Sequence, residues 1–321
     1  MQLPSPESIE KVILENYLEY SHLFTEFQSK FLSGLHSRYQ SIENGNIVLY
    51  FANQTHHNIL RKKDYDFNFD VSLDKFWINH HEIQYEQIPI IKIAYDTFLP
   101  KETVRRKILH LVKKKVLNKK NRKIEWSPND QYKQNYNINI TKEIKGVAKL
   151  TDYVCKKINL SISNQIVTKE LEDKFSFYWF HFLNAQIEYL KEWNKYFNDL
   201  ELLLITIQIA TLVASKTKEK NLSYEDIFKD PSSLKDFISA SISATSVSDV
   251  TGIPRATCVR KLETLAKLKI VSQDKITKRY YILPDATSKN FIPKEITLKV
   301  VKLFSKFYFI CIRGIIFNNS N

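Results

Sequence analysis

Glycine and proline are scarce in this sequence, with five Gly and nine Pro among 321 residues. Sandwiches and barrels of many short strands need these residues at their tight turns, so the scarcity argues against an all-β fold. Long helices joined by short polar loops fit better, and the hydrophobic fraction of 43% suffices for a sizeable core. We therefore expect a mainly α protein that forms two domains rather than one.

Cysteine is also rare, and Cys155, Cys258 and Cys311 lie far apart. Because the count is odd and no CxxC pair occurs, the sequence supports neither a disulfide framework nor a zinc cage. Nucleotide-binding and hydrolase signatures such as GxxxxGK[ST], GxGxxG and GxSxG are missing too. We therefore predict that the protein is not an enzyme and uses no cofactor.

Histidine and aspartate occur in small groups without the spacing of a metal or nuclease site. The doublets His56-His57 and His80-His81 place adjacent side chains in different directions, and no HExxH accompanies them. The run KKDYDFNFD at 62–70 has carboxylates but no Lys or His at a recognisable catalytic spacing. We predict no metal site and interpret 62–70 as a loop.

A run long enough to cross a membrane is lacking as well. The longest uncharged apolar stretch, Leu202–Ser215, has fourteen residues, fewer than the roughly 20 that a bilayer requires. The first twenty residues lack the basic and apolar regions of a signal peptide. Lysines and an arginine interrupt the C-terminal segment, 284–321, which predicts an amphipathic helix docked on the protein. We expect no membrane contact and a cytoplasmic, nucleoid-associated protein.

One short segment occurs twice in the chain. Residues 99–117 read LPKETVRRKILHLVKKKVL and residues 253–271 read IPRATCVRKLETLAKLKIV. Seven of the nineteen positions are identical at a constant spacing of 154 residues. A weaker likeness extends upstream, where aromatic-rich 23–31 faces 177–185. We therefore predict an internal duplication of a unit of roughly 110 residues.

The positive charge of the chain is concentrated in the repeated segments. The formal net charge is +13, of which residues 101–123 carry +10 and residues 255–279 carry +6. The remainder of the chain is therefore slightly negative, which a general bias toward lysine would not produce. Such a concentration is typical of a surface that binds phosphate groups.

The duplication predicts the domain layout. A stretch rich in Asn, Gln and Ser with no apolar period separates the copies and is interpreted as a linker. The predicted divisions are 1–126, with a first basic unit at 85–126, a polar linker at 127–150, 151–283, with a second basic unit at 240–283, and the helix at 284–321.

The second copy has clear signals for helix ends. Gly252 can supply the left-handed residue that ends a short helix, and Pro254 suits the first position of the next. Cys258, Leu262 and Leu265 then recur with the spacing of a buried helix face. The runs KIVSQ and RYYIL flank a polar turn and predict a two-stranded ribbon.

The first copy keeps this plan with changes. Val104, Ile108 and Leu111 repeat the buried spacing, and KKNRK at 119–123 predicts a shorter, more basic ribbon. Phe98 stands where the second copy has its glycine, so the turn is less clearly specified there.

Short helix, turn, basic helix and ribbon form the order of a winged helix-turn-helix. The segment SVSDVTGIPRATCVRKLETLAKLKIV (246–271) resembles the DNA-binding module of bacterial transcription regulators of the IclR and MarR type. Those regulators usually have Gly at the position of Lys269, and the likeness does not reach their effector domains. The resemblance implies two winged helices, each with one helix in the major groove and a ribbon at the neighbouring backbone.

We predict a sequence-specific regulator of transcription that binds double-stranded DNA at two unlike half-sites about one helical turn apart. Outward residues of the basic helices would contact bases, and other cations would contact phosphates. The predicted base contacts are Lys101, Thr103, Arg105, Arg106, Arg255, Thr257, Val259 and Arg260. The predicted backbone contacts are Lys119, Lys120, Arg122, Lys123, Lys261, Lys275, Lys278 and Arg279.

Two other functions stay open at this point. The first is a plasmid-type replication initiator, whose gene should lie beside iterated origin repeats rather than beside a regulated operon. The second is a winged-helix adaptor that binds protein, as in chromosome-segregation scaffolds, although the concentrated positive charge argues against it. Further partners that the sequence allows are a second copy bound through the helical segments and a small-molecule effector of unknown identity.

Overall fold

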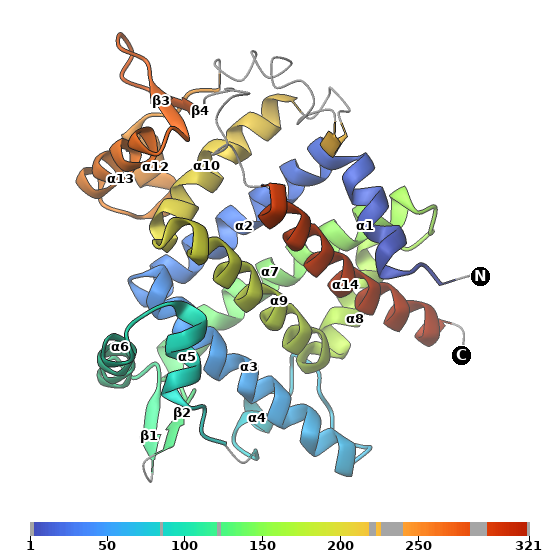
Figure 1. Ribbon diagram of the computed structural model, residues 1–321. Coiled ribbons are helices and arrows are strands. Elements are labelled where there is room, and N and C mark those ends of the chain that lie inside the picture. Colours follow the sequence, from blue (N-terminus) through green and yellow to red (C-terminus); the bar gives the residue numbers. More distant parts are fainter. Residues whose placement is uncertain are drawn as a thin grey trace.

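The computed structural model describes residues 3–83, 86–120, 123–217, 223–225, 240–282 and 294–319. These residues are mostly helical, as the composition predicts, and contain two small antiparallel sheets of two strands each (Figure 1). The first elements are α1 (Pro6–Glu15), α2 (Tyr17–Tyr39), α3 (Ile42–Tyr65), α4 (Phe76–His80), α5 (Ile90–Thr97), α6 (Lys101–Lys113), β1 (Asn118–Lys120) and β2 (Lys123–Glu125). The later elements are α7 (Asp130–Lys157), α8 (Asn164–Asp173), α9 (Phe175–Phe197), α10 (Leu200–Thr217), α12 (Ala244–Thr251), α13 (Arg255–Lys267), β3 (Val271–Gln273), β4 (Tyr280–Ile282) and α14 (Lys294–Asn319).

The polar linker predicted at 127–150 is wrong, because most of this stretch belongs to the long helix α7. The side chain of Asn129 caps its first turn by accepting a backbone hydrogen bond at 3.0 Å. Ile140, Ile144 and Val147 form a narrow buried stripe at helical spacing. This stripe is narrow, and the Asn and Lys residues around it face solvent. The apolar residues therefore give only a weak helical period in the sequence, and the helix was not predicted.

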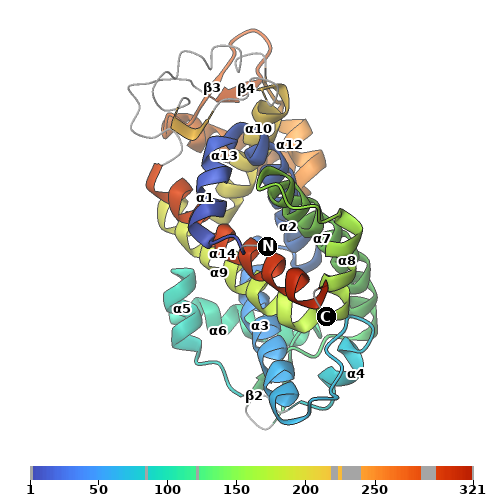
Figure 2. The same ribbon diagram turned by 90° about the vertical axis from the view of Figure 1, so that its right-hand side faces the viewer.

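The N-terminal and C-terminal parts of the chain share one core. α2 packs against α10, and in the reciprocal arrangement α9 packs against α3. Ser29 of α2 and Gln208 of α10 exchange two hydrogen bonds of 3.0 and 2.8 Å inside this contact. Figure 2 shows α1 beside α14, although these helices lie at opposite ends of the sequence. The expected helix at 284–321 is present as α14, and it is part of the core.

A buried ion pair fixes α7 against α2. Arg38 Nη1 lies 2.9 Å from Glu143 Oε1, and the two side chains are only 10% and 12% exposed. Burial raises the pKa of the Glu143 carboxyl, although the Arg38 guanidinium opposes this shift. Since Arg38 lies at the end of α2, the pair ties α7 to the side of the core on which α3 begins.

The longest uncharged apolar stretch, Leu202–Ser215, lies within α10, and its Leu203, Leu204 and Ile205 are almost fully buried. Within the described residues, no single helix combines the length and apolarity needed to cross a bilayer. α9 and α10 have the required length and apolarity only when they are taken together, and the chain bends by 99° between them.

Candidate nucleic-acid interface

Two parts of the structure have matching local geometry. The first unit consists of α5, α6, β1 and β2, and the second unit consists of α12, α13, β3 and β4. Each begins with an eight-residue helix followed by a thirteen-residue helix, and every helix end in one unit lies 154 residues from its counterpart. Prolines 100 and 254 precede the longer helices with nearly identical backbone angles. The spacing seen in the sequence therefore corresponds to a repeated local conformation.

The turns between helices explain two sequence differences. Gly252 ends α12 with φ of 73°, and Phe98 ends α5 with φ of 55°, so a bulky residue adopts the same left-handed conformation. Lys115 and Lys269 follow the longer helices with φ of 56° and 57°. Lys269 occupies the position at which the regulators named in the sequence analysis usually have Gly. Glycine adopts these angles without the cost of roughly 1–2 kcal/mol that a side chain adds. The turns thus keep their shape without glycine.

Each unit packs on the long helix that precedes it, a feature that the sequence analysis missed. The first unit contacts α3, and the second contacts α10. In the second unit Ile242 exchanges two backbone hydrogen bonds of 2.8 Å with Tyr280 and so extends the ribbon by one bridge. The long helices therefore position both units on the shared core.

Two lysines at matching positions anchor the basic helices to those long helices. Lys107 of α6 lies 2.6 Å from Glu43 in the first turn of α3. Lys261 of α13 binds Asp199 and lies 3.3 Å from Glu201, both at the start of α10. Their side chains are only 21% and 16% exposed. The ammonium group of Lys261, predicted as a phosphate contact, is therefore occupied within the fold, and the contact with DNA stays a prediction.

Replacing Lys261 by Met should lower the free energy of unfolding by about 1–2 kcal/mol, because two partly buried carboxylates would lose their cation. Urea denaturation measures this change, and Lys107→Met should behave in the same way. Lys278→Met is the control, since this ribbon lysine is exposed and should change stability by less than about 0.5 kcal/mol. A Lys261→Met protein of unchanged stability and weakened duplex binding would contradict the structural role.

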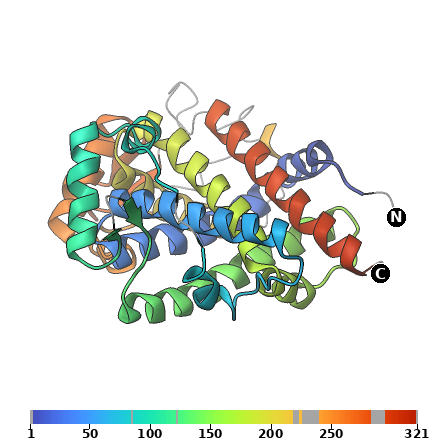
Figure 3. The ribbon, with the colours of Figure 1, turned by 90° about the horizontal axis from the view of Figure 1, so that it is seen from below.

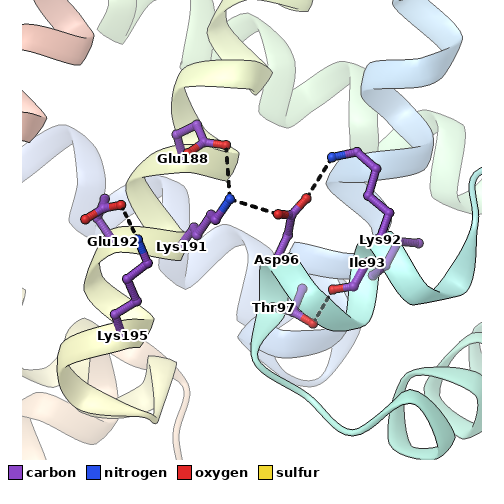
Figure 4. A network of polar contacts seen from close by, with 8 residues as sticks. All are labelled: Lys92, Ile93, Asp96, Thr97, Glu188, Lys191, Glu192 and Lys195. Carbon is purple, nitrogen blue, oxygen red and sulfur yellow. Dashed lines mark hydrogen bonds and ion pairs between the residues drawn. The ribbon is translucent and has the colours of Figure 1, made fainter.

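A second polar network holds the first unit against α9 (Figure 4). Asp96 of α5 accepts hydrogen bonds of 2.8 Å from Lys92 and from Lys191 of α9. Burial opposes ionisation of Asp96, but the hydrogen bonds from the two lysines outweigh it and hold the pKa below its usual range. Asn194 of α9 donates a 2.8 Å hydrogen bond to the carbonyl of Thr97. The turn before α6 is therefore fixed to the core.

Most of the predicted DNA contacts lie on the surface. Those with exposed side chains are Lys101, Arg105, Arg106, Lys119, Lys120, Lys123, Arg255, Arg260, Lys275, Lys278 and Arg279. Thr103, Thr257 and Val259 are half-buried, and Val259 also packs partly against the core. Arg122 lies outside the described residues. The structure adds exposed basic residues that were not predicted as contacts, namely His110, Lys113, Lys114, Lys115, Lys267 and Lys269.

Three of the exposed arginines are engaged with nearby protein groups. Arg105 pairs with Glu102 on its own helix at 2.8 Å, and both side chains are solvent-exposed. Arg255 Nε donates to the Thr245 hydroxyl at 3.1 Å, and Arg279 donates to the carbonyl of Ser241 at 2.7 Å. The side chains of Arg106 and Arg260, by contrast, have no hydrogen bond or ion pair to the described part of the chain. These two arginines occupy the same position in the two units and are available to a ligand.

Both units lie on the same side of the molecule. In Figures 1 and 3 α6 and α13 are at the left edge, and the helical core lies to their right. The two ribbons extend in opposite directions along that edge, β1–β2 downward and β3–β4 upward in Figure 1. One surface therefore presents two basic helices with a basic ribbon beyond each.

One histidine of each doublet, His56 and His80, forms part of the core. His56 stacks on Phe76 with ring centroids 4.8 Å apart, and a ring nitrogen of His80 bonds to the backbone carbonyl of Trp126. Burial lowers the pKa of His56 to about 3 and that of His80 to about 4. Among the described residues, no three His, Cys, Asp or Glu side chains are grouped to hold a metal ion.

Stability should fall as the pH drops from about 6.5 toward 4. The two histidines take up protons in the unfolded chain near pH 6.5 but stay neutral in the folded protein. Each histidine therefore lowers the free energy of unfolding by up to about 1.4 kcal/mol for every pH unit of acidification in this range. His56→Phe should retain the ring contact and reduce this pH dependence, as measured by urea denaturation at several pH values. An unchanged dependence would show that other groups cause the acid sensitivity.

An effector site stays a prediction. An apolar cavity of about 90 Å³ lies among α2, α9, α10 and α14 and is lined by Phe24, Tyr189 and Trp193. This volume is below the roughly 300 Å³ at which ligand pockets for small molecules usually begin. No known protein family, curated protein or solved structure matches the chain.

Proposed function

We propose that this protein is a sequence-specific regulator of transcription that binds double-stranded DNA through two winged helix-turn-helix units. The observation that carries the proposal is the pair of basic helices, α6 and α13, exposed on one side of the molecule with Arg106 and Arg260 at matching positions. A helix of this kind fits the major groove, and the ribbons reach phosphates on either side. The net charges of +10 and +6 in the two segments supply the attraction to phosphate.

The packing of the core supports an inverted arrangement of the two DNA half-sites. At the spacing of 154 residues, α2 corresponds to α9 and α3 corresponds to α10. Exchanging the two halves therefore converts the contact of α2 with α10 into the contact of α9 with α3. Only a twofold rotation has this property, whereas a translation would leave one contact unmatched. The opposite directions of the ribbons agree with such a rotation. We infer that this protein arose by internal duplication and that it binds two unlike DNA half-sites in inverted orientation.

Selection of bound sequences from a random duplex library tests this proposal. The wild-type protein should enrich two different half-sites, inverted and with centres about 10 base pairs apart. Arg260→Ala should relax the preference at one position of one half-site, at a cost of about 1–3 kcal/mol, and Arg106→Ala should do so in the other. Equal weakening on all sequences would make these arginines phosphate contacts. Half-sites in direct orientation would contradict the twofold arrangement.

One observation favours protein binding by the first unit as a second candidate function. Ile91, Tyr95 and Phe98 lie along one face of α5 and are 63%, 75% and 42% exposed. An exposed apolar stripe of this kind is common at protein interfaces. A first unit that binds protein would leave only the second half-site in the selected sequences, so the selection experiment also separates these functions.

A further inference from the structure

A groove between α2 and α7 combines an apolar floor with a basic rim. Its volume is about 650 Å³, and Phe27, Phe31 and Leu150 contribute to the floor. At Gly146 an added Cβ would lie 2.5 Å from the Phe27 ring, so glycine allows this ring to lie directly against the backbone of α7. Val250, an exposed residue of the second unit, borders the groove.

Four lysines surround this groove. Lys30 and Lys149 share one carboxylate, that of Glu26, at distances of 2.6 and 3.6 Å. Lys142 and Lys145 are exposed on α7 and have no hydrogen bond or ion pair within the described residues. The remaining acidic group of the lining, Glu143, is the buried partner of an arginine on α2. The rim therefore has an excess of positive charge and suits an acidic, apolar ligand.

The complementary chemistry is present elsewhere on the same chain. The acidic loop, residues 64–68, consists of the last two residues of α3 and the turn after them, and it contains the exposed carboxylates of Asp64 and Asp66. Tyr65 and Phe67 in this loop are 87% and 85% exposed. A hydrogen bond from the Lys63 ammonium to the carbonyl of Phe67 helps to hold the loop in place. Aromatic residues exposed in this way are typical of the centres of protein interfaces.

We propose that the acidic loop of one copy of this chain docks in the α2–α7 groove of a second copy. Tyr65 and Phe67 would cover the apolar floor, while Asp64 and Asp66 would face the lysines of the rim. The loop and the groove belong to different surfaces, since the loop follows the far end of α3 and the groove borders the second unit (Figure 1). The contact is therefore head-to-tail and leaves one free loop and one free groove, so that further copies can add. It does not depend on the proposed binding of DNA.

Sedimentation velocity on the full chain, over a range of concentrations in roughly 50 mM salt, tests the contact. The wild-type protein should form species larger than a dimer as its concentration rises. A loop variant, Tyr65→Ser/Phe67→Ser, and a groove variant, Lys142→Glu/Lys145→Glu, should each remain monomeric. The control Lys11→Glu/Lys169→Glu makes the same charge change at exposed sites on α1 and α8 and should assemble like the wild type.

Mixing the two variants gives the decisive result. The groove variant still offers an intact loop, and the loop variant still offers an intact groove, so one contact can form between them. We expect the mixture to yield dimers and nothing larger. A monomeric wild-type protein, a monomeric mixture, or variants that assemble like the wild type would each overturn the proposal. Circular dichroism of both variants, with wild-type helix content, verifies that they are folded.

Discussion

Raising the salt concentration from about 50 to 200 mM should weaken binding of this protein to a DNA duplex by roughly a thousandfold or more. The reason is the number of exposed cations on the two units, which include Lys113, Lys114 and Lys115 beside the ribbon lysines. If roughly six to ten of these cations contact phosphates, each contact releases counterions whose return is favoured by added salt. Fluorescence anisotropy of a labelled duplex measures the affinity at each salt concentration.

A plot of the logarithm of the affinity against the logarithm of the salt concentration has a slope that depends on the number of phosphate contacts. Comparing this slope between variants locates the residues that make these contacts. Lys119→Gln/Lys120→Gln should reduce this slope by about two, because it removes two ribbon cations. Lys11→Gln/Lys169→Gln removes the same charge from α1 and α8 and should leave the slope unchanged. Absence of binding at about 50 mM salt would exclude the proposed function. Binding that changes little by 200 mM would exclude phosphate as its main source of affinity.

The largest effect on stability is expected at the buried ion pair between α2 and α7. Arg38→Met should lower the free energy of unfolding by about 3–5 kcal/mol, because it leaves the Glu143 carboxylate buried without its cation. Arg38→Met/Glu143→Leu should recover most of the loss, since the second change removes the unpaired charge. Chemical denaturation in urea gives both values.

An exposed pair provides the comparison. Arg105 and Glu102 are 58% and 73% exposed, and Arg105→Ala should change stability by less than about 1 kcal/mol. If Arg38→Met lowered the free energy of unfolding no more than Arg105→Ala does, the result would show that water reaches the pair of Arg38 and Glu143 in solution. If the double variant were as unstable as the single one, the loss would come from packing of the Arg38 side chain rather than from its charge.

The local elements of the two units could be predicted from the sequence because their signals are short-range. Gly252 in a left-handed turn and the buried spacing of Cys258, Leu262 and Leu265 depend on neighbouring residues, and the structure has both. The strands of the second ribbon, β3 and β4, also lie within the predicted runs, whereas β1 and β2 extend beyond the predicted 119–123. Ser243 caps the start of the short helix, where its hydroxyl accepts a 3.0 Å hydrogen bond from the backbone N–H of Ser246.

Features that depend on distant parts of the chain were not predicted. The sequence shows the first part of α7 as a polar stretch because only Ile140 and Ile144 are buried there, and α2, which packs against α7, is remote in sequence. The matching lysines 107 and 261 have the type and position of DNA contacts, and only their proximity to acids on α3 and α10 reveals their structural role. In a segment that occurs twice in one chain, identity between the two occurrences can therefore reflect the fold rather than the ligand.

The reciprocal packing of α2 with α10 and of α9 with α3 has a consequence for synthesis of the protein. Neither half can bury the contact faces of these helices by itself, because α2, α3, α9 and α10 each have their main partner in the other half. A nascent chain that ends before α9 would expose the faces of α2 and α3 to solvent. We expect the core to close late in translation, after α10 has left the ribosome, so chaperones that bind apolar segments would meet this chain during its synthesis.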